Sequence, residues 1–179
     1  MNVNTSELKR FRAEKDGVFA RDPHSPLTDD QRRNFQGLEY FDENPQLVIQ
    51  AGIDREVDPE EVRMGTSSGE EQVYHRYGLV RFRVDEQPAQ LTLYSSEDSA
   101  ELFVPFRDAT SGHETYGAGR YLEVEAHDDH VTIDFNYAYN PNCAYDSAWS
   151  CPLPPTENWL RVPIRAGEKT FAAGHEATA

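Results

Sequence analysis

Long apolar runs are missing from this sequence. Nowhere do about 18 apolar residues follow one another, the length that a membrane-spanning helix needs. The first residues, MNVNTSELKRFRAEKDG, also lack the apolar stretch of a secretory signal peptide. We therefore expect a soluble cytoplasmic protein that does not use a membrane as a partner.

Lysine is scarce. Only Lys9, Lys15 and Lys169 occur among 17 basic residues, against 32 acidic residues and a formal net charge of −15. The acidic residues are dispersed, which favours a surface adapted to high salt, where ionic screening shortens charge repulsion. A surface that binds cations or basic partners is the alternative, although acidic blocks are more typical of it. Nucleic acid is not an expected partner, because phosphate binding depends on Lys and Arg and weakens steeply with salt.

Cysteine is equally rare. Cys143 and Cys151 have seven residues between them, a spacing that fits neither the Cys-x-x-Cys motif of redox enzymes nor the short ligand spacing of a zinc site. In a reducing cytoplasm we expect thiols in place of a bridge. The simplest interpretation is that Cys143 packs as a small apolar side chain under Tyr145 and Trp149.

Motifs for metals and nucleotides are absent too. The segment 127–130, His-Asp-Asp-His, lies between two expected strands, where Asp-Asp is typical of a turn. His75 or His113 could complete a metal site with the cysteines, but no spacing indicates it. The sequence contains no Walker-type phosphate loop and no Gly-x-Gly-x-x-Gly turn between a strand and a helix. We predict no metal and no cofactor.

The 179 residues are enough for one domain with its own core. Residues 1–37 form the helical part: apolar residues at near-helical spacing predict an amphipathic helix from Ser6 to about Phe19. Thr28-Asp29-Asp30-Gln31 has the spacing of a capping box, which predicts a short second helix that ends before Gly37.

From residue 46 the apolar pattern changes to a period of two, which is typical of strands. Val80, Phe82 and Val84 alternate with Arg81 and Arg83, so one face of the sheet is expected to be core and the other solvated. The expected strands cover 46–50, 62–66, 72–84, 90–95, 101–106, 121–126 and 130–137. No helical crossovers separate them, which favours an antiparallel meander.

The predicted fold is therefore mostly β: a single-domain antiparallel barrel or sandwich with one or two N-terminal helices packed against it. Residues 46–137 form the antiparallel sheet. Residues 138–166 form a structured loop, rich in aromatic residues and proline, and a last strand. Residues 167–179 are small and polar and are expected to fray as a tail.

Three further stretches carry a family resemblance. They are FVPFRDATSGHETYGAGRYL from residue 103, DFNYAYNPNCAYDSAWSCPLPPTENWLRVPIRAGEK from residue 134, and YHRYGLVRFRV from residue 74. With the N-terminal FRAEKDGVFARDPHSPLTDDQRRNFQGLEYF, the chain resembles domain-of-unknown-function family 1684, found in bacteria and archaea, over nearly its whole length. The resemblance implies no established activity.

The loop 106–121 concentrates hydrogen-bonding groups and glycines directly after a strand. Arg107 and Arg120 could bind an anionic group, and Tyr116 could donate a hydroxyl. A purely structural loop is the stronger interpretation, with Asp108 bonding local backbone and the arginines paired with Asp108 and Glu114.

The loop 136–152 follows the strand that is expected to pair with the one leaving 106–121, so the two loops should meet at one end of the sheet. Our leading hypothesis is a small-molecule or ion-binding domain whose pocket these loops form. The predicted ligand-binding residues are Arg107, Asp108, Tyr116, Arg120, Asn140 and Cys143.

Two other function classes stay open. One is a hydrolase or a thiol- or metal-dependent enzyme that uses the same pocket, with Cys143, Asp108 and Glu114 as candidate catalytic residues. The other is a structural or interaction protein without a pocket. The oligomeric state is not indicated.

Overall fold

The computed structural model describes residues 5–172. It begins with the helix α1 (Thr5–Arg21) and the short helix α2 (Asp29–Arg33). At α2 the Thr28 hydroxyl accepts from the Gln31 N–H at 3.2 Å, and the Gln31 amide oxygen accepts from the Thr28 N–H at 2.9 Å. Both bonds of the predicted capping box are present, which confirms the second helix.

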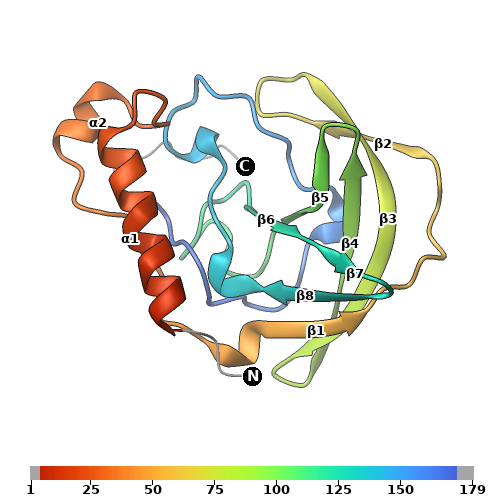
Figure 1. The fold of residues 1–179 in the computed structure, drawn as a ribbon. Coiled ribbons are helices and arrows are strands. Elements are labelled where there is room, and N and C mark those ends of the chain that lie inside the picture. The colour runs from red at the N-terminus through yellow and green to blue at the C-terminus, as the bar shows by residue number, and fades with distance from the viewer. Residues whose placement is uncertain (1–4, 173–179) are drawn as a thin grey trace.

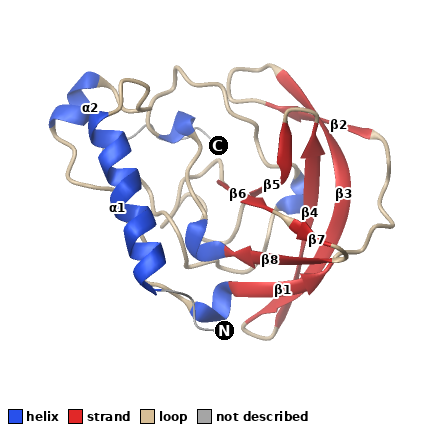
Figure 2. Cartoon of the chain, viewed as in Figure 1, coloured by secondary structure: helices blue, strands red, loops and turns tan. Residues whose placement is uncertain are grey.

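The described residues contain eight strands in two antiparallel sheets. The five-stranded sheet has the order β2-β3-β4-β5-β6, and the three-stranded sheet has the order β1-β8-β7 (Figure 1). The strands are β1 (Val48–Gly52), β2 (Glu61–Gly65), β3 (Glu71–Val84), β4 (Gln87–Ser96), β5 (Ser99–Phe106), β6 (Arg120–Val124), β7 (Ala126–His127) and β8 (His130–Asp134). The predicted mostly β fold is confirmed as a sandwich-like arrangement without a closed barrel (Figure 2).

The core lies between the two sheets. Val80, Leu91 and Val104 of the five-stranded sheet and Ile133 of the three-stranded sheet are fully buried and belong to one cluster. Burying such side chains stabilises the fold by about 1.5–3 kcal/mol each. The period-two pattern places them there.

The end of the expected strand 130–137 departs from the period-two pattern, which would place Phe135 on the core face and Asn136 on the solvated face. Phe135 is buried as expected, but residues 135–137 form a 3-10 turn and leave the strand. Asn136, expected on the solvated face, is also buried, and its amide bonds the backbone N–H and carbonyl of Asn44. The polar Asn136 side chain can be buried because it forms hydrogen bonds with both backbone groups of Asn44, in the segment that leads into β1.

Helix α1 covers loops more than sheet. Phe11 contacts Tyr137 edge-on at 5.0 Å between ring centroids, and Phe19 contacts Tyr145 at 5.1 Å. Figure 1 shows α1 on one side of the molecule and the five-stranded sheet on the other, with loops between them. None of the described helices is both long and apolar enough to cross a bilayer.

The segment 138–166 has no strand in the part of the chain that the structure describes, and isolated bridges take its place. It contains the 3-10 turns η3 (Asn142–Ala144) and η4 (Thr156–Asn158). After η4 the chain runs parallel to the end of β5: Arg107 donates its N–H to the Asn158 carbonyl at 3.1 Å, and Leu160 donates to the Arg107 carbonyl at 2.7 Å.

The segment expected to be a frayed tail begins as part of the core. Glu168 is 1% exposed and its carboxylate is fully engaged, so Gly167–Lys169 are anchored. Our expectation was wrong for these residues, because a polar residue can be buried when it has several partners. Residues 173–179 of the expected tail lie outside the described residues.

Candidate functional site

The loops 106–121 and 136–152 meet, as predicted. Tyr116 donates its hydroxyl to the Cys143 sulfur at 3.7 Å. Tyr121 and Tyr139 exchange backbone hydrogen bonds of 2.9 and 3.1 Å. We call this contact the loop junction.

Asp108 organises the first of these loops from inside. Its Oδ2 accepts from the Thr110 hydroxyl at 2.8 Å, the Thr110 N–H at 3.2 Å and the Ile164 N–H at 2.7 Å. The side chain is 1% exposed. These bonds match the structural interpretation of the loop, in which the carboxylate holds backbone.

Arg120 is buried beside it. Its Nη2 lies 3.5 Å from Asp108 Oδ1 and donates to the Ile164 carbonyl at 2.8 Å, while Nη1 donates to the carbonyls of Ala166 and Glu168. Burial lowers the pKa of Arg120, and the Asp108 carboxylate opposes that shift. The guanidinium holds segment 164–168 in place and does not face solvent.

Glu168 forms a second buried polar centre, which we did not predict. Its Oε2 accepts from the Asn140 N–H at 2.6 Å and from Lys15 Nζ at 3.1 Å, and its Oε1 accepts from the Tyr145 hydroxyl at 2.9 Å. Asn140, a predicted binding residue, also donates its side-chain amide to the Lys169 carbonyl. The Glu168 carboxylate thus joins α1, the second loop and the C-terminal segment.

The two cysteines are free and buried at the loop junction. The Cys143 N–H donates to the Cys151 sulfur at 3.4 Å. A hydrogen bond from the Cys151 thiol lowers the pKa of Cys143 to about 6, against the opposing effect of burial. The same interaction raises the pKa of Cys151 well above the ordinary value.

The remaining predicted residues lie apart from the cysteines. The Arg107 guanidinium lies over the Trp159 ring, 4.6 Å from its centroid. Glu114 is exposed and pairs with Arg165 at 3.0 Å. In the turn 127–130, Asp128 has a φ of 55° and His127 pairs with His130, which confirms a hairpin turn.

A cleft opens where the five-stranded sheet splits. β4 and β5 pair only at Tyr94 with Phe103 and at Ser96 with Ser99. Further along, the Asn158 amide spans the split, bonding the Thr92 N–H and carbonyl and the Pro105 carbonyl at 2.8–3.0 Å. Beyond this clamp, Trp159 and Leu160 run beside Arg107, which follows β5. They therefore move away from the N-terminal end of β4.

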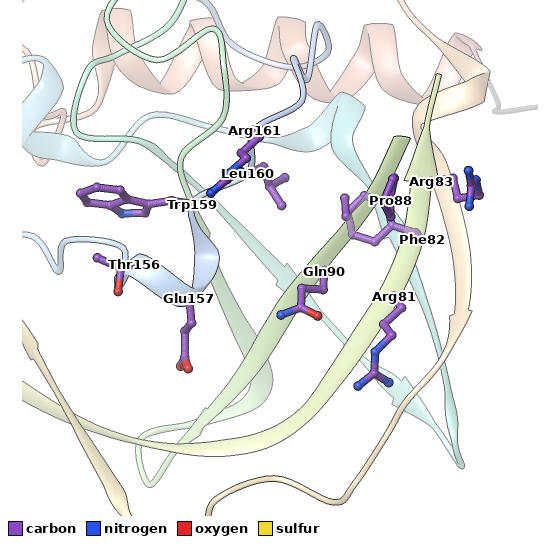
Figure 3. Close-up of a pocket in the computed structure, with 11 residues that line it drawn as sticks. Arg81, Phe82, Arg83, Pro88, Gln90, Thr156, Glu157, Trp159, Leu160 and Arg161 are labelled. Carbon is purple, nitrogen blue, oxygen red and sulfur yellow. The ribbon is translucent and has the colours of Figure 1, made fainter. Parts of the chain in front are cut away.

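We call the resulting space of about 640 Å³ the outer cleft. In Figure 3, Trp159 and Arg161 lie on one side, Gln90 and Pro88 lie between, and Arg81 and Arg83 lie on the neighbouring strand. The residues that line it are Arg81, Phe82, Arg83, Pro88, Ala89, Gln90, Thr156, Glu157, Trp159, Leu160 and Arg161. None of the six predicted ligand-binding residues lines the outer cleft. Arg107 contacts it indirectly, because its guanidinium stacks on the ring of Trp159.

Backbone groups also face the outer cleft. In a strand the N–H and carbonyl of one residue point to the same edge, and this direction repeats every second residue. Thr92 directs both groups at Asn158, so Gln90 directs its own groups to the same edge of β4. The cleft thereby has a donor and an acceptor on a rigid strand.

The outer cleft is basic although the protein is acidic. Its lining includes three arginines and one glutamate, Glu157, whose carboxylate is held by Arg76 at 3.1 Å and by the Tyr94 hydroxyl. Arg81 pairs with Asp54 at 3.0 Å. Among residues 5–172 no carboxylate forms an ion pair with Arg83 or Arg161.

These features define a mostly β, two-sheet domain with a basic cleft at a split sheet edge. Residues 33–169 match the family described as a protein of unknown function, DUF1684, and the chain belongs to this family. The resemblance in the sequence is thereby confirmed.

One solved structure extends the comparison. A solution NMR structure of an uncharacterized protein from Haloarcula marismortui is 38% identical, with a TM-score of 0.71, and the match covers 92% of this chain and 93% of that chain. No curated protein matches the chain.

Proposed function

We propose that this protein binds a small anion with a planar group in the outer cleft. The supporting observation is the pair of arginines without carboxylate partners, Arg83 and Arg161, in a cleft of a chain with a net charge of −15. Guanidinium groups suit carboxylates and phosphates because their fork of donors matches two oxygens.

The planar group is proposed from Trp159. The side chain is 49% exposed although it is large and apolar, and Arg107 lies over one face of the ring. This stacking orients the indole, and an aromatic ligand on the exposed part would gain about 0.5–1.5 kcal/mol beyond its burial. Gln90 supplies backbone and amide groups that would fix the ligand's orientation.

Fluorescence of Trp159 tests this proposal. Trp149 is the other tryptophan and is also exposed, so the variant Trp149→Phe leaves Trp159 as the single reporter. Two matched pairs separate charge from shape: nicotinate against nicotinamide, and adenosine monophosphate against adenosine. Each pair is titrated at low salt and at molar potassium chloride.

The anion of at least one pair should bind about tenfold more tightly than its neutral partner, a difference of about 1.4 kcal/mol. Arg161→Ala should remove most of this preference, whereas Arg63→Ala, an exposed arginine of β2 outside the cleft, should leave it unchanged. Equal or undetectable binding of all four compounds would contradict the proposal.

An enzyme is the second candidate, supported by the contact between the Tyr116 hydroxyl and the Cys143 sulfur. A thiol with a lowered pKa is a candidate nucleophile. Native mass spectrometry of protein purified without added metals separates these classes from a purely structural protein: a retained anion supports binding, and a thiol adduct supports the enzyme.

The cellular setting is part of the proposal. The net charge of −15 and the three lysines support a cytoplasmic protein adapted to high salt, without a nucleic-acid partner. The stability of the folded chain in molar salt, compared with that at low ionic strength, tests the adaptation. Unfolding at a lower temperature in molar salt would contradict it.

A further inference from the structure

The two thiols of the loop junction are neighbours in space although seven residues separate them in the chain. Cys143 lies in η3, and Cys151 follows the exposed residues 147–150, so the chain turns back on itself. The Cys143 N–H donates to the Cys151 sulfur at 3.4 Å. Cys143 is 2% exposed and Cys151 is 6% exposed.

Donors gather around these sulfurs. The Tyr116 hydroxyl donates to the Cys143 sulfur at 3.7 Å, and the Cys143 N–H donates to the Cys151 sulfur. Hydrogen bonds to sulfur favour the thiolate. The arrangement therefore pairs a Cys143 thiolate with a Cys151 thiol that holds a proton.

Neighbouring backbone holds Cys151 in place. The Ser67 N–H donates to the Cys151 carbonyl at 2.9 Å, and the Cys151 N–H donates to the Ser67 hydroxyl at 3.1 Å. Leu153 continues the contact by donating to the Gly65 carbonyl of β2 at 2.8 Å. Cys151 is thus attached to the edge of the five-stranded sheet next to β2, whereas Cys143 lies in η3 at the start of the exposed loop between the two cysteines.

We propose that Cys143 and Cys151 form a reversible intramolecular disulfide when the protein meets a small peroxide. The burial of both sulfurs selects the oxidant, because hydrogen peroxide is little larger than water whereas a glutathione-sized disulfide needs an open path. A resolving thiol in contact with the attacking thiolate is the arrangement that redox-sensitive cysteines require.

The reaction has two steps. The Cys143 thiolate attacks one oxygen of hydrogen peroxide, an S–O bond forms, the O–O bond breaks, and the leaving hydroxide takes up a proton to give water. Cys151 then attacks the Cys143 sulfur, the S–S bond forms and the S–O bond breaks. The second hydroxide takes the Cys151 proton, so two thiols are oxidised and one peroxide is reduced to two waters.

The bond would connect η3 covalently to Cys151, whose backbone is hydrogen-bonded to Ser67. The exposed loop between the cysteines would then be closed at both ends, which restricts the unfolded chain and raises the melting temperature. The reduced protein keeps the same contact through hydrogen bonds, so oxidation requires little rearrangement of the fold.

Intact-mass spectrometry tests the proposal on the full chain. The reduced protein is treated with an equimolar amount of hydrogen peroxide at neutral pH. We expect a loss of the mass of two hydrogen atoms, reversed by a phosphine reductant. After chymotryptic cleavage at Tyr145 or Trp149, between the two cysteines, we expect two fragments that stay linked until they are reduced. The oxidised form should melt at a higher temperature than the reduced form.

Two variants assign the roles. Cys151→Ser should leave Cys143 as a sulfenic acid that dimedone traps, and Cys143→Ser should react with peroxide several-fold more slowly. Cross-linking of the wild-type cysteines in the digest decides the proposal if a variant does not fold. Unchanged thiols, or added oxygen atoms without a linked peptide, would overturn it.

Discussion

The side-chain oxygen of Asn158 accepts a 2.8 Å hydrogen bond from the backbone N–H of Thr92, although 66 positions separate the two residues. The same amide donates to the carbonyls of Thr92 and Pro105. One buried side chain therefore satisfies backbone groups of β4 and β5 where the two strands no longer pair. The outer cleft begins at this clamp.

Replacing Asn158 with alanine should destabilise the fold strongly. The change leaves the three backbone groups of Thr92 and Pro105 buried without partners, at about 1–3 kcal/mol each. We expect a loss of about 3 kcal/mol or more in the free energy of unfolding, measured by urea denaturation. Asn34→Ala, which removes an exposed amide at the end of α2, is the control and should cost less than about 1 kcal/mol. A loss below that value for Asn158→Ala would show that the clamp is unimportant.

Asp108 provides the second prediction. Its removal in Asp108→Ala leaves the Arg120 guanidinium buried without its neighbouring carboxylate, which typically costs about 3–5 kcal/mol. The matched control is Glu114→Ala, since Glu114 pairs with Arg165 on the surface and such pairs contribute about 0–1 kcal/mol. Thermal and urea unfolding measure both. Equal stability of the two variants would contradict a structural role for Asp108.

The thiols provide a prediction in pH. Because the pKa of Cys143 is lowered to about 6, its thiolate fraction rises as the pH increases through that value. The rate of alkylation by iodoacetamide should therefore have its midpoint near pH 6 in the folded protein, whereas ordinary thiols have theirs near about 8.5. Mass spectrometry of digests locates the label. Tyr116→Phe removes one donor to the sulfur and should move the midpoint upward.

A midpoint near 8.5 in the folded wild-type protein would contradict the assignment of Cys143 as the thiolate. Cys151 should react more slowly than Cys143 at every pH tested, because its pKa is raised.

Local patterns in the sequence predicted most of the fold. The alternation of Arg81, Phe82 and Arg83 depends only on the pleat of a strand, and the capping box at Thr28 depends on residues three positions apart. Such short-range geometry is the same in any fold, so the strands and the second helix could be located without a structure.

Long-range polar contacts could not be predicted in this way. Glu168 lies in a stretch of small and polar residues that is typical of a tail, and its buried role depends on Lys15 at the other end of the chain. The role of Asn158 could not be predicted either, because the sequence around an asparagine does not indicate which distant strands its amide will bridge. The family resemblance, which extended to Lys169, was the one signal that this segment belongs to the domain.

The candidate site also has a part that the sequence could have indicated and a part that required the structure. The residue types of the 106–121 loop suit either a pocket or a structured turn, and only burial separates the two. Arg120 and Asp108 are buried and bonded to backbone. In contrast, the alternation from Trp159 to Arg165, with Leu160, Val162 and Ile164 buried, could have indicated a strand-like segment that exposes Trp159 and Arg161.

Nuclear magnetic resonance of the amide groups tests the central claim, anion binding in the outer cleft, most directly. Uniformly labelled protein is titrated with adenosine monophosphate and nicotinate, with adenosine and nicotinamide as neutral controls. The account predicts that an anion shifts the Trp159 indole and the Gln90 amide signals while those of Trp149 and Cys143 stay in place. Shifts confined to the loop junction, or none with either anion, would contradict it.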